Sequence, residues 1–303
     1  MARLRILGVP MDFGTSRRGV DMGPFATRYT DLRRRLERLG HEVEDGGNIS
    51  VPFREDAIVG TNANARYLRT ITDVCREVAA GTRTAVAEGR IPIVLGGDHS
   101  LAAGSIAGAA AHFAARGERI GVIWVDAHGD LNTPETSPSG SVHGMPLAHL
   151  LGHGDVALGS VAGVHPAVRA QDVALVAVRD LDPGERDHIA AWGVRAHTMR
   201  AVDERGIKDI VSDAIQVAST GTSGIWVSFD MDAVDPEDAP GVGTPVAGGL
   251  SYREAHTAME LIADSGKLIG LDLVEVNPVL DERNRTAALG TELVLSAMGK
   301  KVL

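Results

Sequence analysis

The sequence is short of cysteine, of positive charge and of long apolar runs, and each shortage excludes a class of protein. Cys75 is the single cysteine among 303 residues, so no disulfide can form within the chain. We therefore expect a reducing, cytoplasmic location and a packing role for Cys75. The longest weakly polar stretch, 101–115, falls short of the ~20 apolar residues that a membrane-spanning helix needs. The apolar run at the N-terminus is too short for a signal peptide.

The charge balance argues against two kinds of partner. Lys and Arg number 30 and Asp and Glu number 40, which gives a formal net charge of −10. A negative surface repels nucleic-acid phosphates and anionic membranes, so a small-molecule partner is favoured. The length alone predicts two domains, but no stretch resembles a linker, and we expect one domain over 1–303.

Short β-branched runs alternate along the chain with helix-length amphipathic or Ala-rich stretches. Strands are expected at 4–9, 41–44, 91–95, 120–125, 174–178, 194–197, 224–229 and 268–274. Helices are expected at 27–39, 61–88, 101–116, 202–219, 251–264 and 286–300. This alternation predicts an α/β fold with a parallel sheet covered on both faces. It leaves open whether the sheet is doubly wound or closed into a (β/α)₈ barrel, both of which bind ligands at the carboxyl ends of the strands.

Acidic and imidazole side chains follow three of the expected strands, in the segments 96–100 (Gly-Gly-Asp-His-Ser), 126–132 (Asp-Ala-His-Gly-Asp-Leu-Asn) and 230–236 (Asp-Met-Asp-Ala-Val-Asp-Pro). Alternate residues of an extended chain project to one side, so Asp126, His128 and Asp130 should converge. The same holds for Asp230 and Asp232. A single Asp at a strand end is usually a helix cap or a turn residue. That interpretation does not account for five groups that face the same way on two strands.

Electrostatics favours a pair of metal ions at this cluster. Two carboxylates ~4 Å apart repel by ~4 kcal/mol at an effective dielectric constant near 20. Two divalent cations would balance four carboxylates, while His99 and His128 supply neutral nitrogen ligands. Mixed nitrogen and oxygen ligation suits Mn²⁺, Fe²⁺, Co²⁺, Ni²⁺ or Zn²⁺ better than Ca²⁺. Asp98 should point away from the ions and accept a hydrogen bond that orients an imidazole.

These motifs resemble the ureohydrolase family, and further segments resemble arginases more than its other members. They are Arg17-Arg-Gly-Val-Asp-Met-Gly-Pro24, Thr136-Ser-Pro-Ser-Gly-Ser-Val-His-Gly144, Ala239-Pro-Gly-Val-Gly-Thr-Pro245 and Glu275-Val-Asn-Pro278. The resemblance spans essentially the whole chain. It implies a central eight-stranded, mostly parallel sheet with two Mn²⁺ ions at its carboxyl edge. The implied reaction is hydrolysis of L-arginine to L-ornithine and urea by a hydroxide that bridges the two ions.

The resemblance also assigns roles to residues of the site. The implied metal ligands are His99, Asp126, His128, Asp130, Asp230 and Asp232. Asp130 would also hydrogen-bond the hydroxide and pass a proton to the departing amine. His143 resembles the proton shuttle of the family, Glu275 would face the guanidinium, and Thr244 would line the same end of the pocket. Without the resemblance, His143 would be interpreted as a surface loop histidine and Thr244 as an ordinary turn residue.

Substrate choice is expected to depend on a Ser-rich loop. Asn132, Ser137 and Ser139 match the positions that bind the α-carboxylate of arginine in the family. The acids that receive the α-amino group match Asp182 and Glu185, although Asp182-Pro183-Gly184 also reads as an ordinary turn.

Ser141 departs from the arginase pattern, which typically has Asn there, and this puts one carboxylate contact in doubt. Another guanidino-acid hydrolase is therefore an alternative. An agmatinase is also an alternative, but it would be expected to lack the Ser-rich loop. A non-catalytic arginine or metal sensor is a third possibility, against which the intact Asp130, His143 and Glu275 argue. The resemblance further implies a homo-oligomer, either a trimer or a hexamer.

Overall fold

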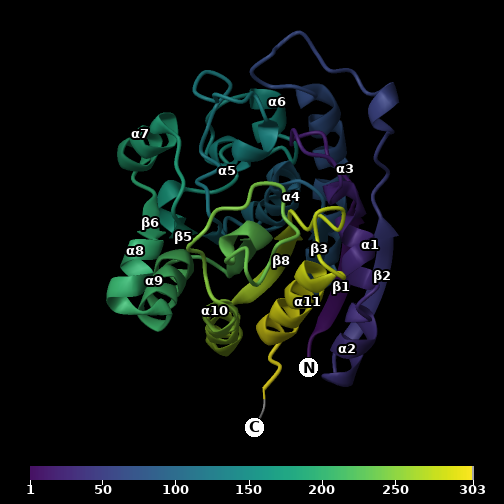
Figure 1. Ribbon diagram of the computed structural model, residues 1–303, viewed down its shortest axis with the longest axis vertical. Coiled ribbons are helices and arrows are strands. Elements are labelled where there is room, and N and C mark those ends of the chain that lie inside the picture. Colours follow the sequence, from purple (N-terminus) through teal and green to yellow (C-terminus); the bar gives the residue numbers. More distant parts are fainter. Residues whose placement is uncertain (302–303) are drawn as a thin grey trace.

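A computed structural model describes residues 1–301, and its centre is one parallel sheet (Figure 1). The strands are β1 (Arg3–Val9), β2 (Glu42–Asn48), β3 (Ile91–Gly96), β4 (Gly121–Val125), β5 (Val173–Val178), β6 (Arg195–Thr198), β7 (Ile225–Asp230) and β8 (Leu268–Val274). Their order is β2-β1-β3-β8-β7-β4-β5-β6, and every pair is parallel. The sheet has two edges, so the doubly wound alternative is confirmed and the barrel is wrong.

Helices cover both faces of the sheet (Figure 1). They are α1 (Gly23–Arg28), α2 (Leu32–Arg38), α3 (Leu68–Ala87), α4 (Ala102–Ala114), α5 (Pro146–Leu150), α6 (Val156–Gly159), α7 (Pro183–Trp192), α8 (Met199–Arg205), α9 (Ile207–Ser219), α10 (Tyr252–Ser265) and α11 (Arg285–Ala297). Between residues 1 and 301, none of these helices combines the length and the apolar composition that crossing a membrane requires.

The core has two halves because alternate residues of each strand face opposite sides. In β4, Ile123 and Val125 belong to the apolar cluster that also contains residues of α2, α9, α10 and α11. Val122 and Trp124 face the other side and pack with α3, α4 and α5. All five residues of β4 are buried, as expected for a central strand covered on both faces.

The helices differ from the expected ranges where a residue adopts a left-handed backbone. The expected helix 27–39 is split between α1 and α2, with Asp31 at φ 62°. The helix expected at 61–88 is α3, which begins seven residues later, directly after Tyr67 at φ 58°. Gly206 at φ 80° separates α8 from α9 within 202–219. Such conformations interrupt the backbone hydrogen bonds of a helix without changing its apolar pattern.

The chain connectivity opens a crevice over the middle of the sheet. After β3 the chain passes to β4, three places away in the sheet, and β7 and β8 later fill the gap between them. Ligands in open α/β sheets bind outside the carboxyl ends of strands at such a change of direction. The four strands β3, β8, β7 and β4 therefore end around the expected site.

Candidate metal centre

The four central strands each deliver a residue to the site at their carboxyl ends. His99 begins a 3₁₀ turn after β3, Asp126 directly follows β4, Asp230 is the last residue of β7, and Glu275 directly follows β8. Asp230 accepts a hydrogen bond from the backbone N–H of Asp232 and so caps the turn that carries it. Sheet geometry brings together residues that are up to 176 positions apart in the chain.

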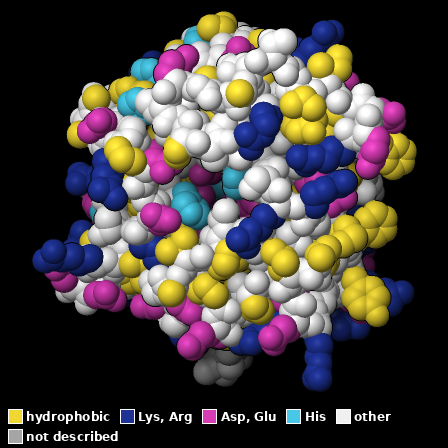
Figure 2. Space-filling view, turned by 45° about the horizontal axis from the view of Figure 1, so that its top comes forward, with side chains coloured by type: hydrophobic (Ala, Val, Ile, Leu, Met, Phe, Trp, Pro, Cys, Tyr) yellow, Lys and Arg dark blue, Asp and Glu magenta, His cyan; other side chains and the backbone are white. Residues whose placement is uncertain are grey.

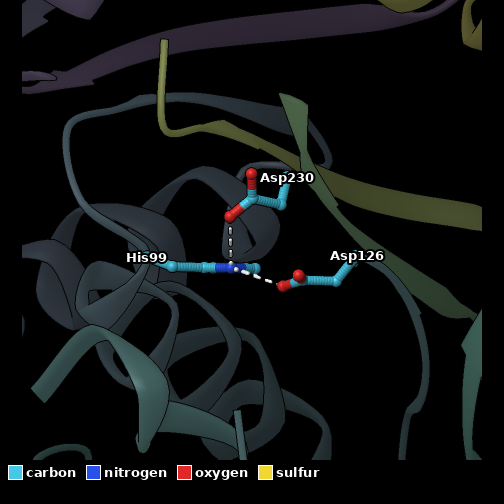
Figure 3. Close-up of side chains that lie close together, drawn as sticks. All are labelled: His99, Asp126 and Asp230. Carbon is cyan, nitrogen blue, oxygen red and sulfur yellow. Dashed lines mark ion pairs between the residues drawn. The ribbon is translucent and has the colours of Figure 1, made fainter. Parts of the chain in front are cut away.

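One group of side chains surrounds the ring of His99 (Figure 3). Its Nδ1 lies 3.1 Å from Asp126 Oδ2 and 3.1 Å from Asp230 Oδ2. Asp130 Oδ2 is 3.0 Å from the same nitrogen. The three carboxylates come from two strands and converge on one imidazole nitrogen, as the spacing predicts.

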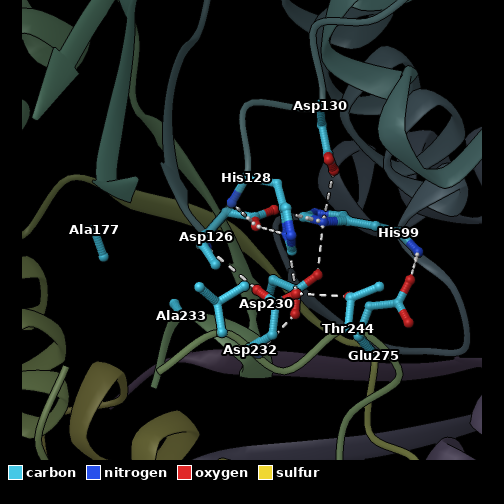
Figure 4. Close-up of polar contacts among 12 residues, drawn as sticks. His99, Asp126, His128, Asp130, Ala177, Asp230, Asp232, Ala233, Thr244 and Glu275 are labelled. Atoms are coloured by element: carbon cyan, nitrogen blue, oxygen red, sulfur yellow. Dashed lines mark hydrogen bonds and ion pairs between the residues drawn. The ribbon is translucent and has the colours of Figure 1, made fainter. Parts of the chain in front are cut away.

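A second group adjoins the first and shares Asp126 with it (Figure 4). His128 Nδ1 lies 3.1 Å from Asp232 Oδ2 and 3.4 Å from Asp126 Oδ1. Asp126 thus turns one oxygen toward each imidazole. Two neighbouring sets of three ligands with a shared carboxylate are the arrangement that a pair of ions needs.

Buried atoms without protein partners test whether a metal fits. His99 Nδ1 and Asp130 Oδ2 are buried and, within the described chain, have no hydrogen-bond partner. Backbone N–H groups orient the carboxylates of other ligands, with His128 N 2.7 Å from Asp126 Oδ1 and Asp232 N 2.8 Å from Asp230 Oδ1. Buried polar groups are rarely left unpaired. The inward-facing lone pairs therefore fit divalent cations.

The titration of these groups reflects crowded charge in the metal-free protein. Burial and the carboxylates of Asp232 and Asp126 raise the pKa of Asp230 well above its ordinary value. Burial and Asp126 raise the pKa of Asp130 to about 6. Burial lowers the pKa of His99, but the neighbouring carboxylates outweigh it and raise that pKa overall. Like charges held this close require a cation, either a proton or a metal ion.

The tautomer of His99 follows from the protons around it. Its Nε2 lies 2.9 Å from Ser228 Oγ, and that hydroxyl donates in turn to Asp272 Oδ2 at 3.2 Å. Ser228 has one proton and gives it to the carboxylate, so it must accept from His99 Nε2–H. The lone pair of His99 then lies on Nδ1, which faces the three carboxylates.

The role expected for Asp98 is wrong. Its carboxylate accepts hydrogen bonds from the backbone N–H of Gly14 and from the backbone and hydroxyl of Ser100. It therefore fixes the turn that carries His99 and does not orient the ring, which Ser228 and Asp272 do. Sequence reasoning missed both of these residues. Asp272 could have been found, because it is a charged residue inside the apolar strand β8.

His143 and Glu275 form a hydrogen-bonded pair beside the ligands, in which Glu275 is buried and His143 is partly exposed. His143 Nδ1 is 2.9 Å from Glu275 Oε1, which also accepts from the backbone N–H of His99 at 2.9 Å. Burial lowers the pKa of His143, but Glu275 outweighs it and raises that pKa to about 9. The pairing with Glu275 therefore favours the protonated imidazole of His143. The reading of His143 as a surface loop residue is wrong.

Four of the expected ligands, His128, Asp130, Asp230 and Asp232, line a cavity of about 260 Å³ at the carboxyl edge of the sheet. A hollow with histidine and acidic side chains at its edge marks this face of the molecule (Figure 2). The lining residues are His128, Asp130, Asn132, Ser137, Pro138, Ser139, Ser141, His143, Gly144, Asp180, Asp182, Glu185, Asp230, Asp232 and Thr244. Thr244 donates to Asp232 Oδ2 at 2.9 Å and so holds a predicted ligand. Glu275 is fully buried and is not among the lining residues.

The residues expected to bind substrate lie together at the outer end of this cavity. Asn132 Nδ2 donates to Asp182 Oδ2 at 2.8 Å, which joins the two expected binding regions. Asp182 and Glu185 cap the N-terminus of α7. The segment Asp182-Pro183-Gly184 is therefore the start of a helix and not an ordinary turn. Burial raises the pKa of Glu185 to about 7. Sequence reasoning also missed Arg66, which lies more than 70 positions from the Ser-rich loop that it contacts.

Comparisons with known proteins agree with this geometry. The Arginase family matches residues 2–299. The arginase of Bacillus caldovelox is 46% identical over the full length of both chains, and its solved structure at pH 5.6 superimposes with a TM-score of 0.96, again covering both chains completely. A solved Entamoeba histolytica arginase in complex with L-ornithine is 32% identical, with a TM-score of 0.91 over 99% of this chain and 100% of the other. The chain belongs to the arginase family.

Proposed function

We propose that this protein hydrolyses L-arginine to L-ornithine and urea with two Mn²⁺ ions. The observation that supports this most is the pair of adjoining ligand groups that share Asp126 below the Ser-rich loop. The relatives named arginase, one of them solved with L-ornithine, support the same substrate. Two Mn²⁺ ions held by His99, Asp126, His128, Asp130, Asp230 and Asp232 would lower the pKa of water enough to supply a hydroxide nucleophile near neutral pH.

The protein residues then have separate tasks. Asn132, Ser137 and Ser139 offer neutral donors to the α-carboxylate, and Asp182 and Glu185 receive the α-amino group. These contacts hold the guanidinium carbon over the metal ligands, which lowers the entropic part of the barrier.

Three further residues serve the reacting end of the substrate. Asp130 orients the attacking water, takes a proton from it and passes that proton to the departing amine, which makes that nitrogen a better leaving group. Glu275 stabilises the positive charge of the guanidinium through its Oε2, which has no hydrogen-bond partner among the described residues, while its Oε1 holds His143. His143 exchanges protons between the cavity and solvent.

A urea assay on metal-loaded protein tests this function. Purified protein should be stripped with a chelator, reloaded with Mn²⁺, analysed for metal and assayed on L-arginine and on agmatine. We expect close to two Mn²⁺ per chain, rapid urea release from L-arginine and far slower release from agmatine. The reverse preference would identify an agmatinase, and metal binding without turnover would identify a sensor. Light scattering of the same sample would test the expected trimer or hexamer.

A further inference from the structure

The cavity in which an α-carboxylate is expected is lined by acids and by no cation among the described residues. Two bound divalent cations would offset Asp130, Asp230 and Asp232. Asp180, Asp182 and Glu185 also line the cavity, whereas none of the described lining residues is a lysine or an arginine. His143 is paired with Glu275. A substrate carboxylate would therefore find no cation among the described lining residues, and Asn132, Ser137 and Ser139 offer it only neutral donors.

Arg66 is the cation that contacts the Ser-rich loop. Its Nη1 donates to the backbone carbonyl of Ser139 at 2.7 Å and its Nη2 donates to Ser141 Oγ at 3.2 Å. Its backbone N–H donates to the carbonyl of Gly140 at 3.2 Å. Three successive residues of the loop are thus held by one residue that lies just before α3.

The same loop packs tightly against the segment before Arg66. Gly140 has φ 66°, and a Cβ atom there would lie 2.2 Å from the carbonyl oxygen of Ala63. Only glycine fits this approach and this conformation. Arg66 and Gly140 together set the position of Ser139, whose hydroxyl is expected to bind substrate.

Ser141 connects Arg66 to the cavity. Its side chain lines the cavity, it is 5% exposed, and its hydroxyl oxygen accepts from Arg66. The position at which this sequence departs from the arginase pattern is therefore the position that the guanidinium contacts. One hydrogen bond separates the charge of Arg66 from the wall of the cavity.

We propose that Arg66 is a specificity-determining residue that favours substrates with an α-carboxylate. Its guanidinium fixes the loop that carries Ser137 and Ser139 and supplies positive charge beside a cavity that acids line. Because it acts through Ser139 and Ser141, Arg66 is a positioning residue and takes no part in proton transfer. The inference rests on the function proposed above.

Steady-state kinetics of charge variants at Arg66 test the inference. Arg66→Gln removes the charge and keeps a hydrogen-bond donor, whereas Arg66→Lys keeps the charge and loses the forked geometry. In Arg66→Gln we expect the KM for L-arginine to rise about tenfold, the size of effect expected for one lost charge-assisted contact. The kcat should stay within about twofold, and Arg66→Lys should recover most of the affinity. Hydrolysis of agmatine, which has no carboxylate, should be the same in all three proteins.

Salt dependence and a neighbouring arginine separate charge from structure. The difference in KM between wild type and Arg66→Gln should shrink from 0.02 M to 0.5 M NaCl, because exposed charges are screened within a few ångströms at high ionic strength. Arg69→Gln, an exposed site in the first turn of α3, is the matched control and should leave the KM unchanged. All variants should melt within a few degrees of wild type.

Two results would overturn the inference while leaving the proposed function intact. One is an unchanged KM for L-arginine in Arg66→Gln. The other is an equal rise in KM for L-arginine and for agmatine, or an equal rise in KM for L-arginine in Arg66→Lys and Arg66→Gln. Either outcome would indicate that Arg66 has a structural role and that its charge has none. If wild-type protein released no urea from L-arginine, the proposed function itself would be wrong.

Discussion

At the scale of single residues, two of the expected catalytic side chains sit on left-handed backbone. Asp130 has φ 51° and Glu275 has φ 62°, a conformation that costs non-glycine residues about 1–2 kcal/mol each. In return, Asp130 Oδ2 lies beside His99 and Glu275 Oε1 contacts both His99 and His143. The surrounding hydrogen bonds outweigh this strain, which places two carboxylates where an ordinary strand end would not.

The two ends of the cavity should give opposite kinetic signatures. In Asp130→Asn we expect kcat for L-arginine to fall by about 100-fold or more, because the proton donor for the departing amine is lost. In Ser139→Ala the KM should rise while kcat changes little, because a contact equal in the ground and transition states is lost. Metal analysis of Asp130→Asn is the control, since Asp130 is also a ligand. Wild-type turnover with full metal content would contradict the proton-transfer role.

The hydrogen-bond chain behind His99 should set metal affinity. Ser228→Ala removes the group that fixes the tautomer of His99, and we expect Mn²⁺ to bind about 10- to 100-fold more weakly in calorimetric titrations of the metal-free protein. Ser105→Ala is the matched control, because Ser105 Oγ also donates to Asp272 Oδ2, at 2.9 Å, but does not contact the ring. An equal loss of Mn²⁺ affinity in both variants would mean that the effect comes from the hydrogen bonds of buried Asp272 and not from the orientation of the His99 ring.

At the scale of elements, the sequence predicts strands better than helix ends. All eight strands lie within a few residues of the expected ranges, because buried parallel strands are near-continuous apolar runs. α5, α6 and α7 were not expected, since their short segments carry little periodic signal. The local spacing predicts which ligands meet, but the turns after β4 and β7, and not extended strand, bring them together. Arg66, Ser228 and Asp272 act across the fold, and no local pattern specifies their partners.

The approach of α9 to β4 depends on one glycine. A Cβ atom at Gly121 would lie 1.9 Å from the carbonyl oxygen of Ala218, so Gly121→Ala must push the helix from the sheet. We expect the free energy of unfolding to fall by about 2 kcal/mol or more. Gly81→Ala, within α3, is the matched control, because its Cβ would meet only Leu7 Cδ1 at 3.4 Å and Ile49 Cδ1 at 3.8 Å.

The control should move in the other direction. Alanine is the better helix former, so Gly81→Ala should raise the free energy of unfolding by about 0.5–1 kcal/mol. Urea denaturation followed by circular dichroism measures both variants. Equal free energies of unfolding for the two variants would mean that α9 can move away from β4 at Gly121 without loss of stability.

At the scale of the whole molecule, one sheet joins residues from both ends of the chain. β1 and β8 both pair with β3, and the two halves of the core cover opposite faces of the same sheet. We therefore propose a single domain over 1–303 that unfolds in one transition. The formal charge of −10 includes four acids, Asp126, Asp130, Asp230 and Asp232, that are gathered at one point of this domain. Two bound Mn²⁺ ions would add four positive charges and change the formal net charge to −6.

Metal removal should therefore destabilise the entire protein. A ligand present at 1,000 times its dissociation constant stabilises the folded state by about 4 kcal/mol. For a chain of this size that corresponds to a fall in Tm of about 6 °C when the metal is chelated. Calorimetry of chelated and reloaded protein measures the shift. Mn²⁺ should restore the Tm, whereas the same concentration of Ca²⁺ should restore little of it, because Ca²⁺ prefers all-oxygen ligands and two imidazoles face this site. An equal rescue by Ca²⁺ would mean that charge neutralisation alone stabilises the cluster and that His99 and His128 are not ligands.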